Sequence, residues 1–221
     1  MLKDRVIVAL DVGDTKKAKY FVNKLSPCVR IFKIGAQLFT ECGPEIIRYI
    51  LKKKREVFLD LKFFDIPNTV ANAVKSAVRL KVKMLTLHIQ GADEMLKAAV
   101  KAGREEAARL KMKRPLLIGV TVLTSQKAHP GEILQLAKRG ISCGLDGVVC
   151  SAKEISLLRG KIKNNFLIIT PGIRPKDTKA DDQKRTATAQ EAIKAGADYI
   201  VVGRPILEAA DPIKAVESLF Y

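Results

Sequence analysis

The feature that most constrains the fold is a pattern that recurs eight times along the chain. Each unit begins with a short run rich in Val, Ile and Leu, carries a polar residue or a glycine at the end of that run, and continues with helical periodicity. Apolar strands that alternate with helices indicate a parallel sheet covered by helices. The apolar runs are Arg5–Asp11, Arg30–Gly35, Glu56–Lys62, Lys83–Ile89, Pro115–Thr121, Asp146–Ser151, Phe166–Gly172 and Asp198–Gly203.

The number of units favours a closed sheet. Eight units within 221 residues, without a linker rich in Pro, Gly or Ser, predict a single (β/α)8 TIM barrel of the α/β class that spans residues 1–221. An open, doubly wound sheet has the same alternation of strands and helices, so strand counting alone does not exclude it. In the barrel, the functional residues are expected at the C-terminal ends of the strands.

The charge of the chain narrows the classes of ligand. Lys and Arg number 40 against 23 Asp and Glu, and this net charge of +17 suits an anionic ligand. The densest basic runs, at 52–55, 109–114 and 159–163, each follow a helix-like stretch, where cations complement the helix dipole. No aromatic residue lies among them to stack on bases. We therefore expect no nucleic-acid partner.

Two further features bear on cellular location and metal binding. No apolar run approaches the ~20 residues of a membrane helix, and no signal peptide is recognisable before the first strand, so we expect a cytoplasmic protein without a membrane partner. The cysteines are interpreted as buried thiols, and no His, Cys and Asp cluster has metal-ligand spacing, so no metal is expected. The four cysteines are Cys28, Cys42, Cys143 and Cys150.

The segment 60–69 carries the strongest indication of chemistry. Side chains alternate along a strand, so Phe58, Asp60 and Lys62 share one face. With the aliphatic residues of the other face against the helices, this charged pair is expected to point into the barrel mouth. An ammonium beside a carboxylate keeps its proton, which makes Lys62 a proton donor. The structural alternative is a buried ion pair without a catalytic role.

The loops after the seventh and eighth runs predict a phosphate site. They begin with Pro171-Gly172-Ile173-Arg174 and Gly203-Arg204-Pro205, at the place where barrels usually bind phosphate. Glycine lets backbone N–H groups approach the anion, and each arginine offers a charged fork. Gln183 would add a neutral donor, and the polar stretch 175–182 is expected to form a lid that orders on phosphate binding.

Several motifs together resemble one enzyme family over nearly the whole chain. They are ALD at 9–11, FKIG at 32–35, DLKFFDIPNT at 60–69, VTVLTS at 120–125, TPGIRP at 170–175, DDQ at 181–183 and VVGRP at 201–205. In this order they resemble the orotidine 5'-phosphate decarboxylases. The D-x-K element is shared with related enzymes that act on sugar phosphates, whereas its continuation through D-I-P-N-T separates the orotidylate enzymes from them.

The resemblance implies a decarboxylation of orotidine 5'-monophosphate to UMP without a cofactor, the last step of de novo pyrimidine biosynthesis. It assigns to Lys62 the stabilisation and protonation of a carbanion at C6 of the pyrimidine. It places Asp60 and Lys33 in the same charged array as Lys62, and it brings Asp65 from the neighbouring subunit of a homodimer. These four residues are the implied catalytic group.

The resemblance also implies a binding role for residues around this array. Asp11 would contact the ribose with Lys33, Thr124 would lie near the pyrimidine, and Asp65 and Thr69 would reach the partner's site. His88 is expected to face the barrel with Thr86 and to bond a neighbouring carboxylate. The complete set of implied substrate-binding residues is Asp11, Lys33, Asp60, Asp65, Ile66, Thr69, Thr124, Pro171, Arg174, Gln183, Gly203 and Arg204.

Two other functions stay open at the level of sequence. A metal-dependent sugar-phosphate lyase on the same barrel would need acidic ligands at the ends of the second and third strands, but the second strand carries Lys33 there. A basic barrel that only binds phosphorylated ligands or RNA would retain the charges of Asp60, Lys62 and Asp65 without a use for them, although buried charges are costly.

Overall fold

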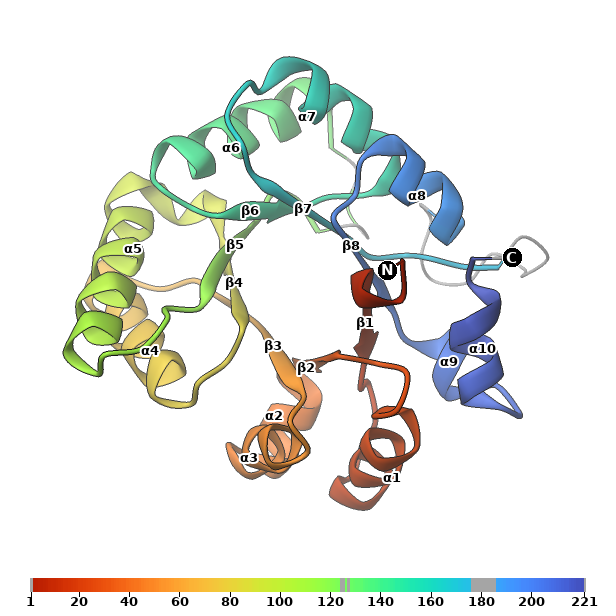
Figure 1. Ribbon diagram of the computed structural model, residues 1–221. Coiled ribbons are helices and arrows are strands. Elements are labelled where there is room, and N and C mark those ends of the chain that lie inside the picture. Colours follow the sequence, from red (N-terminus) through yellow and green to blue (C-terminus); the bar gives the residue numbers. More distant parts are fainter. Residues whose placement is uncertain (1, 124–125, 127, 176–185, 221) are drawn as a thin grey trace.

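The strands form a closed parallel barrel. The computed structural model describes residues 2–123, 126, 128–175 and 186–220, and in these ranges the strands follow one another in sequence order around the barrel (Figure 1). β1 pairs with β2 on one side and with β8 on the other, which closes the sheet and rules out the open, doubly wound alternative. The strands are β1 Val6–Ala9, β2 Ile31–Gly35, β3 Glu56–Phe63, β4 Met84–His88, β5 Leu116–Val120, β6 Gly147–Val149, β7 Leu167–Thr170 and β8 Tyr199–Val202.

The helices form an outer ring around these strands, as Figure 1 shows. Most strands are followed by a helix that runs back along the barrel, as the alternating pattern predicted. The helices are α1 Thr15–Leu25, α2 Ala36–Cys42, α3 Glu45–Lys52, α4 Pro67–Arg79, α5 Ala92–Arg109, α6 Pro130–Ser142, α7 Ile155–Lys161, α8 Ala189–Ala195, α9 Arg204–Leu207 and α10 Pro212–Ser218. Short 3-10 helices are η1 Leu2–Arg5, η2 Ile89–Gly91 and η3 Ala152–Glu154.

Alternation along the strands divides the apolar side chains between two cores. Ile7, Ile31, Phe58 and Ile169 fill the barrel interior together with four other buried residues. The residues between them on each strand face outward and pack with the helices in a second, larger cluster. Both faces of each strand are therefore buried, which explains the nearly continuous runs of Val, Ile and Leu.

Each predicted run overlaps a strand; β3 extends one residue beyond its run, to Phe63, and the other strands are shorter than predicted. The run Asp146–Ser151, for example, contains only β6, Gly147–Val149. Asp146 lies outside the strand because its carboxylate accepts a hydrogen bond from the backbone of Leu117 at 2.8 Å and pairs with Arg114. Its polar side chain therefore fixes a loop at the N-terminal end of the barrel.

The last helix and the cysteines test two local predictions. Asp211 caps α10 by accepting from the backbone of Ile213, and Pro212 occupies the first turn, as expected for this residue pair. All four cysteines are free thiols. Cys143 and Cys150 are buried, whereas Cys28 and Cys42 are only half-buried. None of the described helices combines the length and the apolar composition that a membrane span requires.

Candidate active site

The C-terminal ends of the strands surround a hollow of about 250 Å³. Its charged lining comes from the ends of β1, β2 and β3 on one side and from the loops after β7 and β8 on the other. Apolar side chains from the inner core, Phe58 and Ile169 among them, form its floor. The remaining lining residues are Ala9, Asp11, Lys33, Asp60, Lys62, Val120, Val122, Leu123, Val149, Pro171, Gly172, Arg174, Val201, Gly203 and Arg204.

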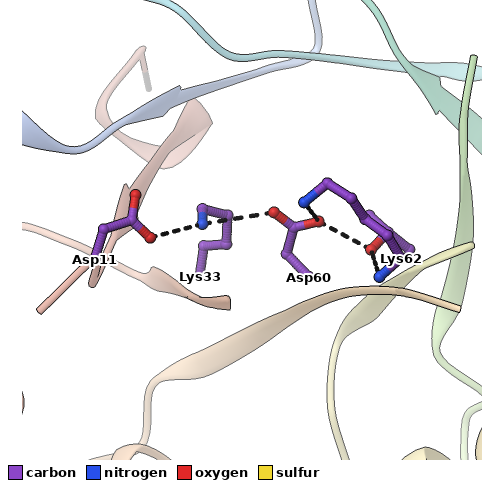
Figure 2. A network of polar contacts seen from close by, with 5 residues as sticks. Asp11, Lys33, Asp60 and Lys62 are labelled. Atoms are coloured by element: carbon purple, nitrogen blue, oxygen red, sulfur yellow. Dashed lines mark hydrogen bonds and ion pairs between the residues drawn. The ribbon is translucent and has the colours of Figure 1, made fainter. Parts of the chain in front are cut away.

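Four charged side chains form a row of alternating sign along one side of this hollow (Figure 2). The Nζ atom of Lys33 lies 3.0 Å from Oδ1 of Asp11 and 3.5 Å from Oδ2 of Asp60. The other oxygen of Asp60, Oδ1, lies 3.0 Å from Nζ of Lys62. Asp60 therefore joins the two lysines, and the row runs across β1, β2 and β3 in spatial order.

Burial and charge together set the state of Asp60. Only 13% of its side chain is exposed, and this burial works against the ionised form. Lys33 and Lys62, together with hydrogen bonds from Lys62 and Thr86, outweigh the burial and hold the pKa of Asp60 below its usual value. The carboxylate is therefore ionised at neutral pH and lies between two ammonium groups.

The backbone at the end of β3 departs from regular strand geometry. The pairing with β4 shifts register between Leu59 and Phe63, and Lys62 has a φ of 51°, in the left-handed region. Its backbone N–H donates to Oγ1 of Thr86 at 2.9 Å. The predicted inward orientation of Asp60 and Lys62 is therefore correct, but for Lys62 it results from a bulge and not from simple alternation.

The loops after β7 and β8 form the opposite side of the hollow. Arg174 is 9% exposed, and its Nη1 donates to the carbonyl oxygen of Ile173 at 3.0 Å. Gly172 has a φ of 77°, which a side chain would strain. Gly203 lies close to the end of β1, since a Cβ there would be 3.5 Å from Cβ of Ala9 and 3.5 Å from Oδ2 of Asp11. Arg204 begins α9 directly after it.

Other predicted site residues lie away from this hollow. Asp65, Ile66 and Thr69 are exposed on the surface after β3, and none of them lines the hollow. The Oδ1 atom of Asp65 accepts from the backbone N–H of Ile66 at 2.7 Å. Thr124, Gln183 and residues 176–182 of the predicted lid lie outside the described residues.

The expectation for His88 was wrong. The hydroxyl of Thr86, not the imidazole of His88, donates to Oδ1 of Asp60, at 2.9 Å. Nδ1 of His88 is buried and has no hydrogen-bond partner among the described residues, and the ring lies 5.6 Å from that of Phe64. Burial, and then the charge of Lys62, lower the pKa of His88, so the imidazole is neutral at pH 7.

Sequence reasoning placed Thr86 on the inner face but missed its contacts. The spacing of Thr86 and His88 on one strand was the available signal, and it does not tell which of the two side chains reaches Asp60. The apolar floor, with Phe58 and Val201, was also missed as a part of the site. Within the described ranges, no group of three or more His, Cys, Asp or Glu residues could hold a metal ion.

Comparison with known proteins identifies the family of this chain. A family model described as Orotidine 5'-phosphate decarboxylase / HUMPS family matches residues 4–219. The chain is 48% identical over 228 residues to an orotidine 5'-phosphate decarboxylase of Trichlorobacter lovleyi, with 98% of this chain and 94% of that protein covered. It is 43% identical over 229 residues to the enzyme of that name from Moorella thermoacetica, with 98% and 91% covered.

A solved structure is similar over the same length. The crystal structure of orotidine 5'-phosphate decarboxylase from Lactobacillus acidophilus has a TM-score of 0.85 and 34% sequence identity, and the match covers 98% of this chain and 97% of that chain. Sequence and structure therefore match along nearly the entire chain, and the chain belongs to the orotidine 5'-phosphate decarboxylase / HUMPS family.

Proposed function

We propose that this protein decarboxylates orotidine 5'-monophosphate to UMP, the last step of de novo pyrimidine biosynthesis, without a cofactor. The observation that carries the proposal is the row Asp11, Lys33, Asp60 and Lys62 at the mouth of the barrel. It faces a hollow whose other side carries Arg174 and Arg204. The site thus offers cations for a phosphate at one end and a charged array for a reacting group at the other.

Substrate binding follows from the chemistry of the two ends. The phosphate would accept hydrogen bonds from Arg174 and Arg204 and from the backbone near Gly172 and Gly203, in the loops where barrels commonly bind phosphate. The ribose hydroxyls would meet Asp11 and Lys33. The pyrimidine would then lie over the apolar floor, with its carboxylate near Asp60 and Lys62.

The reaction needs stabilisation of a localised charge. When the bond between C6 and the carboxylate breaks, CO2 leaves and the electron pair stays on C6 in the plane of the ring, where no adjacent group can delocalise it. A fixed ammonium at Lys62 stabilises this developing charge more than it stabilises the substrate. The same ammonium then transfers a proton to C6, which gives UMP, and the amine regains a proton from solvent.

Removal of the Lys62 amine tests this function. The fall in orotidylate absorbance is followed with the wild-type protein and with Lys62→Ala. We expect kcat to fall by about 10⁴-fold or more, because charge stabilisation and proton transfer are lost together, while the affinity for UMP changes far less. Lys83→Ala is the control, since Lys83 pairs with Glu56 at the other end of the barrel. Near-native turnover by Lys62→Ala would contradict the proposal.

A metal-dependent sugar-phosphate lyase is the main rival within the same fold. Lys33 in β2 favours the decarboxylase, because an ammonium cannot serve as a metal ligand. A fully active enzyme after chelation supports the decarboxylase, whereas turnover of a sugar phosphate that requires added metal supports the rival.

We further propose that the protein works as a homodimer whose subunits complete each other's sites. Phe64 and Ile66 are 61% and 66% exposed, which is unusual for large apolar side chains, and they border a shallow hollow beside Asp65. A second copy seated on this surface would cover them and would carry Asp65 and Thr69 toward its partner's site.

Mixed variants test the contribution of Asp65 between subunits. We expect Lys62→Ala and Asp65→Ala each to be nearly inactive alone, whereas a hybrid dimer of the two would contain one site with both residues intact if Asp65 acts across the interface. We expect a refolded mixture to recover activity that neither variant has. If Asp65 acts only within its own subunit, the mixture stays inactive, which would contradict the shared site. The interface itself is tested by Ile66→Asp: a variant that remains fully dimeric would contradict the proposed interface.

A further inference from the structure

The hydroxyl of Thr86 connects the two central charges of the site. Thr86 lies in β4 and is fully buried. Its Oγ1 accepts from the backbone N–H of Lys62 and donates to Oδ1 of Asp60, both at 2.9 Å. A threonine hydroxyl has one proton and two lone pairs, so these two bonds use its only donor and one acceptor. The same Asp60 oxygen also accepts from Nζ of Lys62 at 3.0 Å.

These contacts occur where the ladder between β3 and β4 is interrupted. From one paired position to the next, β3 advances from Leu59 to Phe63, while β4 advances only from Leu85 to Leu87. The extra residues include Asp60 and Lys62, and Lys62 takes up the left-handed backbone conformation. A bulge of this kind redirects side chains but leaves backbone groups without their regular partners.

Thr86 compensates for that interruption. Its side-chain oxygen accepts the N–H of Lys62 at a position where the neighbouring strand is out of register. The strained backbone of Lys62 would otherwise cost free energy, and it persists only when surrounding contacts determine it. The proton of the same hydroxyl selects one oxygen of Asp60 and so turns the carboxylate toward Lys62.

We propose that Thr86 is a positioning residue for the decarboxylation: it holds the backbone of Lys62 and the carboxylate of Asp60 in one rigid unit, so that the Lys62 ammonium is aimed into the hollow before substrate binds. The inference rests on the proposed role of Lys62. Thr86 itself does not line the hollow, and it acts through the two residues that it holds.

A set of variants at Thr86 tests the proposal. Thr86→Val keeps the shape and removes both hydrogen bonds, whereas Thr86→Ser keeps the hydroxyl. We expect Thr86→Val to lower kcat by roughly 10²-fold, the cost of a reacting group misplaced by about 1 Å, with KM changed by less than about threefold. Thr86→Ser restores kcat to within about fivefold of the wild type because it can make the same two hydrogen bonds.

Thr170→Val is the matched control. Thr170 is also a fully buried threonine at the end of a strand, but its hydroxyl has no hydrogen-bond partner within the described residues. This variant should keep kcat within about twofold, so it separates the loss of the Thr86 bonds from the general effect of a threonine-to-valine change in the barrel. If Thr86→Val does not accumulate as folded protein, Thr86→Ala, which also lacks the hydroxyl, is measured in the same way.

The pH profile gives a readout that a merely structural role would not move. Asp60 faces Lys33 from β2, Lys62 from its own strand and Thr86 and His88 from β4, and Asp11 lies beyond Lys33. Without the Thr86 donor, the pKa of Asp60 rises, and the acid limb of kcat moves to higher pH. An unmoved acid limb together with a kcat within twofold of the wild type would overturn the proposal.

The outcomes also separate this inference from the proposed function. If Lys62→Ala abolishes turnover but Thr86→Val does not lower kcat, the role of Lys62 stands and the role of Thr86 is wrong. If Lys62→Ala keeps its turnover, the proposed function itself fails. A Thr86→Ser variant as impaired as Thr86→Val would likewise contradict positioning through the hydroxyl.

Discussion

Two carboxylates of this chain are nearly buried between two cations, and they lie in different surroundings. Asp60 lies at the barrel mouth between Lys33 and Lys62. Glu106 lies in the outer helices, where α5 meets α4, between Arg79 and Arg109 at 2.6 and 2.7 Å. Both have a pKa below the usual value, and hydrogen bonds from Arg109 and Arg79 bring that of Glu106 to about 2.

The difference between the two clusters lies in what the cations face. The arginines of Glu106 hold it through short hydrogen bonds on the outside of the barrel, away from the hollow. The lysines of Asp60 line the hollow, where a substrate can meet their ammonium groups. A lowered carboxylate pKa therefore does not identify an active site by itself. The location of the carboxylate, at the strand ends around a hollow, distinguishes the candidate active site from a structural ion pair.

Asp60→Asn is expected to have the largest effect. It removes the negative charge between the two lysines while keeping the size of the side chain, so kcat should fall by about 10³-fold because the array loses its charge balance and Lys62 its partner. Steady-state turnover of orotidylate measures this. The equivalent change among the outer helices, Glu106→Gln, is the control and should leave kcat within about twofold of the wild type. If Asp60→Asn keeps kcat within tenfold of the wild type, the proposed difference between Asp60 and Glu106 is wrong.

Arg204→Ala should have the next largest effect, on substrate binding. Loss of one charge-assisted bond to the phosphate is expected to raise KM by roughly 10- to 100-fold, the equivalent of about 1.5–3 kcal/mol. Titration with UMP measures the affinity directly. Arg79→Ala, an arginine change in the outer cluster, is the control and should leave the affinity for UMP unchanged, whereas equal effects of the two variants would argue against a phosphate site beside Gly203.

Glu106→Gln should affect stability and its dependence on pH. The pKa of Glu106 is about 2 in the folded protein against 4.5 as a usual value, so its ionised form stabilises the fold. This stabilisation is complete above pH 4.5 and is lost as the pH falls toward 2. We expect a lower Tm for Glu106→Gln at pH 7 and a shrinking difference from wild type in thermal melts at decreasing pH. A constant difference at all pH values would contradict the assignment.

Metal removal should have the smallest effect. Dialysis against EDTA is expected to change kcat by less than about twofold, because in the proposed mechanism the charged array supplies the stabilisation that a metal would supply in a related lyase. Recovery of lost activity by one added divalent metal would contradict this expectation and would favour the lyase.

Much of the fold could be predicted because it depends on local patterns. Eight apolar runs that are buried on both faces leave few arrangements other than a barrel, and alternation correctly placed Asp60 on the inner face. The bulge at Lys62 could not be predicted in this way, since it depends on the register with β4, a partner distant in sequence. The contact of Thr86 with both residues follows from that register and was missed for the same reason.

The positions of the candidate site residues could be predicted best where the fold itself brings residues together. Asp11, Arg174 and Arg204 line the hollow because they follow the ends of strands, and Lys33 lines it from within β2. Asp65, Ile66 and Thr69 do not line the hollow. Their expected role depends on a second subunit, and the sequence of one chain does not show where that subunit lies.

The most direct test of the ammonium at Lys62 measures the affinity for a UMP analogue that carries an anionic oxygen on C6. The negative charge of this analogue resembles that of the developing carbanion, so the wild-type protein should bind it at least about 10²-fold more tightly than UMP. Lys62→Ala should lose this preference while retaining most of its affinity for UMP. If the variant still prefers the anionic analogue to the same extent, Lys62 is not directed at C6 and the proposed chemistry is wrong.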